Sequence, residues 1–195
     1  MNDIKSVCVF CASSTKVAPT YYKAAQELGQ LLANSHITLI NGAGAIGLMK
    51  ASSDAALMAD GKVIGVIPQF MVDEGWQHTN LTQLIVTDDM HQRKQWMAEH
   101  GDGIIALPGG CGTLEELLEV ITWKQLGIYL KPIVILNING YFNPLIKMLE
   151  HAISENFMRK EHGSLWTVAN TPAEAIHQLR TTKMITENIR KYAVI

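Results

Sequence analysis

The chain has 195 residues, of which 48% are apolar and 17% charged, so it can bury one substantial core and is not a disordered sequence. Its formal net charge of -2 gives no electrostatic reason to bind nucleic acid. No apolar run approaches the roughly 20 residues of a membrane-spanning helix, and the polar start from Met1 to Lys5 is unlike a signal sequence, so we expect a cytoplasmic protein without membrane contact.

Short apolar runs alternate with amphipathic segments along the chain. The runs typical of buried strands are SVCVFCA, ITLING, KVIGVIP, GDGIIALPGG, PIVILNI and SLWTVAN. The segments that predict helices are approximately 20–34, 46–60, 89–100, 113–127, 143–156 and 172–181. This alternation predicts an α/β fold, a Rossmann-like doubly wound parallel sheet with helices on both faces, as one nucleotide-binding domain over residues 1–181. Residues 182–195 are polar and then apolar, which predicts a C-terminal tail that either frays or packs on a partner.

The first apolar run contains a C-x-x-C motif, formed by Cys8 and Cys11. A redox pair would sit at the mouth of a helix, and a zinc site would need a second pair of ligands, which the sequence does not supply. Two small residues packing a buried strand are therefore favoured, and neither a metal nor a cofactor is expected.

Ligands of parallel α/β sheets bind beyond the carboxyl ends of the strands, in the loops that lead into helices. After the second run, the stretch NGAGAIG satisfies G-x-G-x-x-G with Gly42, Gly44 and Gly47. The motif does not follow the first strand, however, and the next run ends in Pro68 and Gln69 where an acidic residue should bind a ribose. A turn that serves chain geometry, or a different small ligand, is favoured over a dinucleotide site.

The stretch IIALPGGCGTLEELLE, residues 104–119, carries the stronger signal. Gly109, Gly110 and Gly112 can adopt backbone conformations closed to other residues, so successive amide N–H groups can turn toward one point. That point faces the N-terminal end of a helix expected to begin near Thr113, which predicts a phosphate site. No Gly-Lys-Ser/Thr sequence follows, so the motif is not a Walker A loop.

The glutamates of this stretch have a structural and a functional interpretation. Thr113 and Glu116 have the spacing of a capping box, with Thr113 as N-cap and Glu116 reaching back to its amide. Beside a bound phosphate, however, carboxylates are repulsive unless a cation compensates or an acid takes part in the reaction. Arg93 and Lys94, at the start of the preceding helix, are the candidate cations, and a solvated pair on a helix face is the alternative.

The motif from Pro108 to Glu116, together with the upstream MHQRK, resembles the LOG ("lonely guy") family of cytokinin riboside 5'-monophosphate phosphoribohydrolases, which carry an older label as lysine decarboxylases. The family motif P-G-G-x-G-T-x-x-E is matched throughout. VCVFCASS, NGAGAIGLM and VIGVIP occur in the family's order, so the resemblance covers most of the chain.

The resemblance implies hydrolysis of the N-glycosidic bond of a nucleoside 5'-monophosphate, with Arg93 and Glu116 as catalytic residues. A glutamate normally follows the IP segment at a fixed interval. Here Glu74 stands one position early and Gly75 occupies the expected place, so Glu74 is the candidate for that contact. The other substrate contacts implied are Lys94, Gly109, Gly110, Cys111, Gly112, Thr113, Leu114, Glu115 and Thr122.

Two other functions remain open from the sequence. One is a general nucleosidase acting on AMP without a cytokinin preference, and the other is a non-catalytic carrier of a nucleotide or of a molybdenum cofactor. Lysine decarboxylation is rejected because pyridoxal phosphate needs a Schiff-base lysine, and none lies in the glycine loop or shortly after it.

The stretch LLEVITWKQLGIYLKP places Trp123, Leu126, Ile128 and Tyr129 around a helix end. This is more apolar surface than one sheet face needs, which predicts a homodimer, as the family resemblance also implies. Core packing within one subunit is the alternative.

Overall fold

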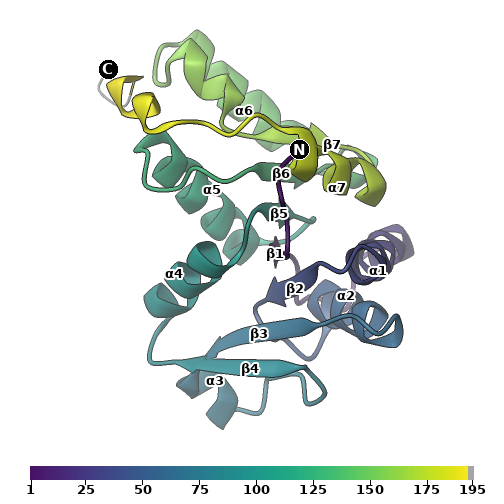
Figure 1. Ribbon diagram of the computed structural model, residues 1–195. Helices are drawn as coiled ribbons and strands as arrows, with labels where there is room; N and C mark the ends of the chain where they lie inside the picture. Colours follow the sequence, from purple (N-terminus) through teal and green to yellow (C-terminus); the bar gives the residue numbers. More distant parts are fainter. Residues whose placement is uncertain (193–195) are drawn as a thin grey trace.

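The computed structural model describes residues 1–192 and contains one seven-stranded sheet (Figure 1). The strands are β1 (Ser6–Phe10), β2 (Thr38–Asn41), β3 (Val63–Pro68), β4 (Gln83–Thr87), β5 (Ile104–Ala106), β6 (Ile133–Leu136) and β7 (Thr167–Ala169). Their order is β4-β3-β2-β1-β5-β6-β7, and every neighbouring pair is parallel.

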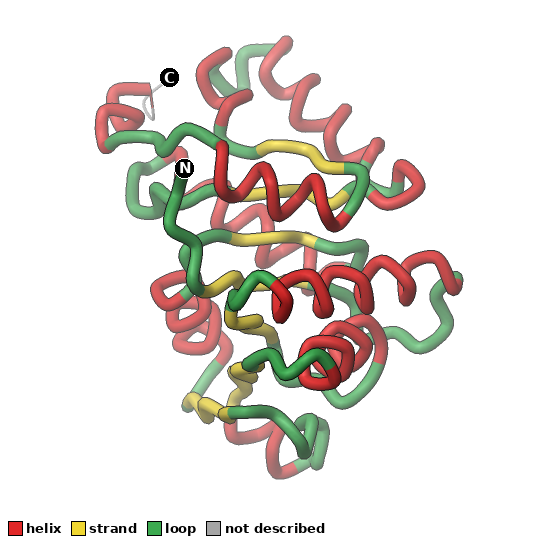
Figure 2. The backbone as a smooth tube through the Cα atoms, turned by 45° about the vertical axis from the view of Figure 1, so that its right-hand side comes forward, coloured by secondary structure: helices red, strands yellow, loops and turns green. Residues whose placement is uncertain are grey.

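Helices cover both faces of the sheet (Figures 1 and 2). The α-helices are α1 (Pro19–Asn34), α2 (Gly47–Met58), α3 (Gln69–Asp73), α4 (Met90–His100), α5 (Cys111–Gln125), α6 (Asn143–Ser154) and α7 (Pro172–Thr181). Short 3-10 helices are η1 (Ile138–Gly140), η2 (Lys160–Ser164) and η3 (Glu187–Tyr192). One core cluster joins the sheet to α1, α2 and α7, and a second joins it to α4, α5 and α6.

Strand β1 shows why the buried strands are apolar on both faces of the sheet. Val7 and Val9 pack in the core beside α1 and α2, while Cys8 and Phe10 pack in the core beside α4 and α5. Successive side chains of a strand point to opposite faces, so a strand covered on both sides must be apolar throughout. This arrangement confirms the predicted doubly wound parallel fold, and Cys8 serves as a buried strand residue, as expected.

Among the strands and α-helices, two were not predicted, β4 and α3. β4 is the edge strand, and its residues are exposed or half-buried. Its sequence contains an apolar run, Leu84 to Val86, but this run is only three residues long between Gln83 and Thr87. α3 has five residues, too few to show a helical period.

The C-terminal segment packs on its own chain, in contrast to the two predicted alternatives. Ile189 is buried in the core beside α5, and the Arg190 Nη2 atom donates to the Gly127 carbonyl at 3.0 Å. Residues 193–195 of the predicted tail lie outside the described residues. Within residues 1–192, none of the helices combines the length and apolar character needed to cross a membrane.

Candidate active site

A cavity of about 580 Å³ opens at the carboxyl ends of β1, β2 and β5. The chain leaves β1 toward β2, while β5 lies against the other side of β1, so the cavity sits where the strand order reverses. Ligands of open parallel sheets bind at such switch points. The glycine and polar residues in its wall are Ser13, Ser14, Gly42, Gly44, Gly110, Gly112, Thr113, Arg93, Glu115 and Glu116.

Helix α5 presents its N-terminal end to this cavity. It begins at Cys111 with Gly110 as N-cap, and no side chain forms a cap hydrogen bond. The predicted capping box is therefore wrong, because Thr113 lies inside the first turn and Glu116 is buried. The first amide N–H groups of a helix have no partner within the helix, so this uncapped end can bind an anion.

The glycines before and within this turn provide space, and they need no unusual backbone conformation. Gly109, Gly110 and Gly112 are absent from the described residues with positive φ, which corrects the expectation that they adopt conformations closed to other residues. A Cβ atom at Gly109 would overlap the Thr113 side chain, whereas at Gly110 or Gly112 it would meet nothing. Gly110 and Gly112 line the cavity, so their missing side chains leave room for a ligand.

Arg93 of α4 and Glu116 of α5 meet in the cavity wall. The Arg93 Nη1 atom is 3.4 Å from the Glu116 Oε1 atom, and each side chain exposes only 9% of its surface. The Arg93 Nε atom also donates to the Val66 carbonyl at 3.0 Å, which fixes the guanidinium over the end of β3. The interpretation of Arg93 and Lys94 as a solvated pair is wrong, since both are buried.

The turn after β2 is shaped to admit this arginine. A Cβ atom at Gly42 would overlap the Arg93 Nη2 atom, so the guanidinium fits only against a glycine. Gly47 has a different role: its φ is +66°, and a Cβ there would overlap the backbone of Ser13. The glycine motif thus serves chain geometry and the placement of Arg93.

Burial raises the pKa of the Glu116 carboxyl above its ordinary value, and the neighbouring Arg93 charge acts in the opposite direction. Glu116 is therefore a carboxylate with increased basicity, held beside a permanent cation. Such a group can stabilise a positive charge or accept a proton from water.

Lys94 and Glu115 form a second pair at the rim. The Lys94 Nζ atom is 2.5 Å from Glu115 Oε1 and 3.0 Å from Glu119 Oε2. Burial disfavours the Lys94 charge, but its hydrogen bonds to the two glutamates raise its pKa above the ordinary value. Glu115 lines the cavity, whereas Lys94 does not.

Four other predicted contacts lie outside the cavity wall. The Gly109 carbonyl accepts a hydrogen bond from the Tyr141 hydroxyl, and the half-buried Leu114 of α5 packs against the core cluster on that face of the sheet. Thr122 donates to the Leu118 carbonyl of its own helix, and Glu74 is exposed at the end of α3. Of the predicted residues, the cavity wall brings together Arg93, Gly110, Cys111, Gly112, Thr113, Glu115 and Glu116.

Sequence reasoning missed the apolar wall of the cavity. It is formed by Ile46, Met49, Met71, Trp76, Met90 and Met97. These residues come from three separate segments, so no local motif joins them. Among the described residues, no group of three His, Cys, Asp or Glu side chains could hold a metal, and no lysine lines the cavity.

The fold and the site define a Rossmann-like α/β protein with a ligand cavity at the switch point of its sheet. The family model described as "possible lysine decarboxylase" matches residues 49–179. A cytokinin riboside 5'-monophosphate phosphoribohydrolase of Arabidopsis thaliana is 40% identical over 185 residues, which cover 95% of this chain and 81% of that protein. One of Rhodococcoides fascians is 43% identical over 178 residues, covering 91% and 90%. The chain belongs to this family of phosphoribohydrolases, the LOG family, which confirms the resemblance.

Solved structures share the fold. The molybdenum cofactor binding protein of Rippkaea orientalis has a TM-score of 0.69 at 24% identity, covering 92% of this chain and 98% of that one. The molybdenum cofactor carrier protein of Chlamydomonas reinhardtii has a TM-score of 0.68 at 23% identity, with coverages of 92% and 98%. At these identities the likeness is evidence for the fold alone.

Proposed function

We propose that this protein hydrolyses the N-glycosidic bond of nucleoside 5'-monophosphates and releases the free base and ribose 5-phosphate. The buried Arg93–Glu116 pair, in the cavity beside the uncapped end of α5, carries the proposal. Relatives that are 40% and 43% identical over most of the chain are named for this activity.

The 5'-phosphate binds at the start of α5. There the backbone N–H groups from Gly110 to Thr113 and the positive end of the helix dipole favour a dianion. The missing side chains of Gly110 and Gly112 let the phosphate approach the backbone.

Glu116 then acts on the sugar. Breaking a ribosyl C–N bond leaves positive charge on the ribose, an oxocarbenium-like state that an ionised carboxylate stabilises. Glu116 lies in the second turn of the helix that holds the phosphate, so both contacts belong to one rigid element. Its raised pKa also suits it to orient or deprotonate the attacking water.

Arg93 stabilises the negative charge that develops on the departing base, and it holds the Glu116 carboxylate in place. It does not act as a general acid, because a guanidinium group keeps its proton at neutral pH. The proton that the base needs is supplied by water or by another group.

The remaining predicted contacts are given roles that fit their positions. Lys94 orders Glu115 and Glu119 at the rim of the cavity. Gly109 lies just before α5, and Leu114 and Thr122 belong to it. In this proposal they help to hold the helix in position and do not contact the substrate. Glu74 is exposed, so we give it a role only where a second subunit completes the site.

Cytokinin riboside monophosphates, whose base carries an apolar N6 substituent, are the preferred substrates in this proposal, and the apolar wall suits such a group. The test is chromatographic detection of free base and ribose 5-phosphate from a panel of nucleotides. Release of isopentenyladenine from its riboside monophosphate, faster than release of adenine from AMP, supports the preference. Faster release from AMP favours the general nucleosidase.

The same experiment separates an enzyme from a carrier. Tight AMP binding without any base release over a long incubation would contradict the proposed hydrolysis and favour the carrier. The description of the family model as a possible lysine decarboxylase fits this site poorly, since pyridoxal phosphate needs a lysine and the cavity wall contains none in the described residues.

The protein works as a homodimer in the cytoplasm in this proposal. The apolar residues Leu118, Leu126 and Ile128 are exposed on α5 and just after it, which suits a second copy of the chain. Cys8, Cys11 and Cys111 are free thiols, as is usual in reducing compartments. Cell fractionation tests the location.

A further inference from the structure

Trp76 is a large apolar residue whose position is not explained by packing in the core. It exposes 53% of its surface and belongs to neither core cluster, yet it lines the same cavity as Arg93 and Glu116. An exposed indole in a cavity wall is a good surface for an aromatic ligand, since it offers a large flat face at a small cost in side-chain entropy.

The chain before Trp76 fixes its backbone through the end of α3. Gly75 has a φ of +72°, the Gly75 N–H donates to the Val72 carbonyl at 2.9 Å, and the Trp76 N–H donates to the Met71 carbonyl at 3.1 Å. This is the Schellman pattern, which requires a left-handed residue where this chain has Gly75. The motif commonly brings the residue after the glycine against the helix, and Met71 and Trp76 indeed line the cavity together.

The chain after Trp76 is joined to the turn after β2. The Ala45 N–H donates to the Trp76 carbonyl at 3.0 Å, and the His78 N–H donates to the Ala43 carbonyl at 2.7 Å. Gly44 and Gln77 form an antiparallel bridge between these two bonds. The segment that carries Trp76 is therefore paired with the turn that admits Arg93.

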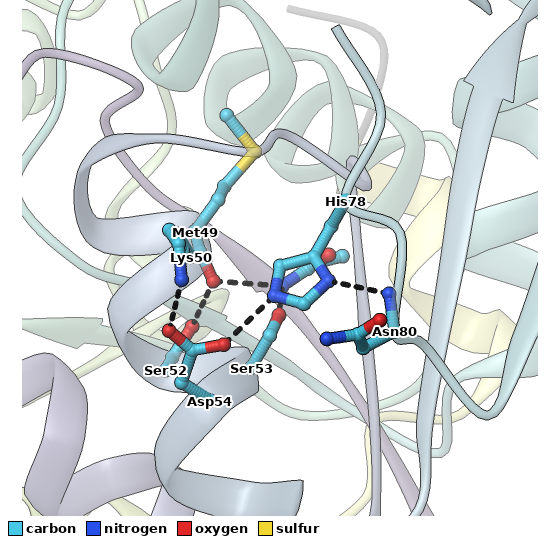
Figure 3. Close-up of polar contacts among 8 residues, drawn as sticks. Met49, Lys50, Ser52, Ser53, Asp54, His78 and Asn80 are labelled. Atoms are coloured by element: carbon cyan, nitrogen blue, oxygen red, sulfur yellow. Dashed lines mark hydrogen bonds and ion pairs between the residues drawn. The ribbon is translucent and has the colours of Figure 1, made fainter.

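A buried histidine ties this pair of segments to α2 (Figure 3). The side chain of His78 exposes 4% of its surface, and its Nε2 atom is 2.8 Å from Asp54 Oδ1. The Asn80 N–H donates to His78 Nδ1 at 3.1 Å, so the ring proton is on Nε2 and is donated to Asp54. Lys50 binds the other Asp54 oxygen from the solvent side.

The order of groups along the cavity places Trp76 on the base side. The Arg93 guanidinium lies between Glu116 of α5 and Gly42 of the β2 turn, to which the Trp76 segment is paired. A nucleotide with its phosphate at the start of α5 and its ribose at Glu116 therefore extends its base toward the β2 turn and Trp76.

We infer that Trp76 is a specificity-determining residue against which the base of the nucleotide stacks, and that His78 and Asp54 are positioning residues that hold it there. This inference rests on the proposed function for the direction in which the nucleotide lies. It assigns a base-recognition role to residues outside the glycine motif and the Arg93–Glu116 pair.

The test compares a ligand that has a base with one that lacks it. Stacking of a base on an aromatic side chain contributes substantially to binding affinity, so Trp76→Ala should raise the KM for AMP roughly 10-fold. The inhibition constant of ribose 5-phosphate, which has no base, should stay within about twofold of wild type. Trp76→Phe keeps an aromatic face and should retain most of the affinity. An unchanged KM in Trp76→Ala, or an equal rise of the KM and the inhibition constant, would overturn the inference.

The positioning role has its own matched variants. His78→Ala should reproduce the selective rise in the KM for AMP, whereas His78→Gln, whose amide can still donate to Asp54, should restore near-normal values. Lys50→Ala removes the other, exposed partner of Asp54 and should leave all constants unchanged. Where His78→Ala does not fold, Asp54→Ala removes the same bond from the more exposed side. Wild-type constants in a folded His78→Ala or Asp54→Ala variant would overturn the role.

Binding measurements keep this inference separate from hydrolysis. If wild type releases no base, the proposed function fails, but intrinsic fluorescence still reports on Trp76. The other tryptophans, Trp96, Trp123 and Trp166, do not line the cavity. AMP should quench wild-type fluorescence, and Trp76→Phe should lose that quenching. Quenching that persists in Trp76→Phe, or none in wild type at saturating AMP, would contradict base stacking.

Discussion

Among single residues, Glu116 has the sharpest consequence when changed. Glu116→Gln keeps the size of the side chain and its hydrogen-bonding oxygen but removes the charge that stabilises the ribosyl cation. Turnover should fall at least about 100-fold, as when other electrostatic stabilisers are removed, while the thermal unfolding curve stays cooperative. Base release followed by chromatography measures the loss. Glu99→Gln, an exposed glutamate on α4, is the control, and near-normal turnover in Glu116→Gln would leave Glu116 a purely structural residue.

The raised pKa of Glu116 predicts opposite trends for stability and activity with pH. Burial raises this pKa, so the folded state binds the proton more tightly than the unfolded chain. Stability is then lost as the pH rises from the ordinary carboxyl value through the raised pKa. The melting temperature of Glu116→Gln minus that of wild type should therefore increase as the pH rises above about 4.3, the ordinary glutamate value. A constant difference across this range would show that the pKa of Glu116 is not raised.

Activity should rise over the same range, because the proposed mechanism needs the ionised carboxylate. The kcat at saturating substrate is the right quantity, since the substrate phosphate itself titrates near about pH 6 and would alter KM. The acidic limb of the kcat profile should lie above about pH 4.3, the ordinary glutamate value. A limb at or below that value would argue against Glu116 as the group that must be ionised.

Gly42 tests whether the position of Arg93 matters as well as its charge. In Gly42→Ala the new methyl group would overlap the Arg93 Nη2 atom, so the guanidinium must leave its present position beside Glu116. We expect turnover to fall about as far as in Arg93→Ala, roughly 100-fold, and the double variant to be little worse than either single one. Independent, additive losses in this double-mutant cycle would show that Gly42 acts by another route.

Among the elements, the start of α5 is where a small change should separate binding from folding. The position of Gly112 leaves room for a Cβ atom and its φ is not positive, so Gly112→Ala should keep the melting temperature within about 2 °C of wild type. Gly112 lines the cavity, so the added methyl group should push the phosphate from the backbone and raise the KM for AMP several-fold. A large loss of melting temperature without a change in KM would contradict this role.

The elements differ in how well the sequence predicts them, for physical reasons. Strands such as β1 and β6 are buried on both faces, and their continuous apolar runs made them predictable. β4 lies at the edge, and its apolar run, Leu84 to Val86, is only three residues long. α5 begins at Cys111, two residues before the predicted Thr113 cap, although the glycine at position 112 is a poor helix former.

The residues of the candidate site also differ in how well the sequence predicts them. Arg93 and Glu116 could be named because each lies in a recognisable local motif, and the fold brings those motifs to one edge of the sheet. Gly42, Trp76 and His78 could not, because the roles we propose for them depend on pairing between a turn and a loop far apart in the sequence. In the sequence, Gly42 belongs to a glycine motif that does not follow the first strand, as a dinucleotide site would require, and His78 belongs to no recognisable motif.

At the scale of the whole molecule, the arrangement of apolar side chains around α5 differs from the prediction. Tyr129 is buried and Trp123 is half-buried, so they pack within the subunit. Leu126 and Ile128 are exposed, and Leu118 joins them from α5 itself. The predicted apolar surface is thus smaller than the sequence indicated, and Ile128 is its most exposed member.

Ile128→Asp should therefore separate the proposed homodimer into monomers. Wild type should show by light scattering a mass about twice the 21.5 kDa of one chain, and the variant the mass of one chain. A charge placed in an apolar contact loses its hydration without a partner, which costs more than a small interface can supply. Phe157→Asp, at a comparably exposed apolar residue after α6, is the control and should remain dimeric. A monomeric wild type, or a dimer that Ile128→Asp leaves intact, would contradict an interface at this end of α5.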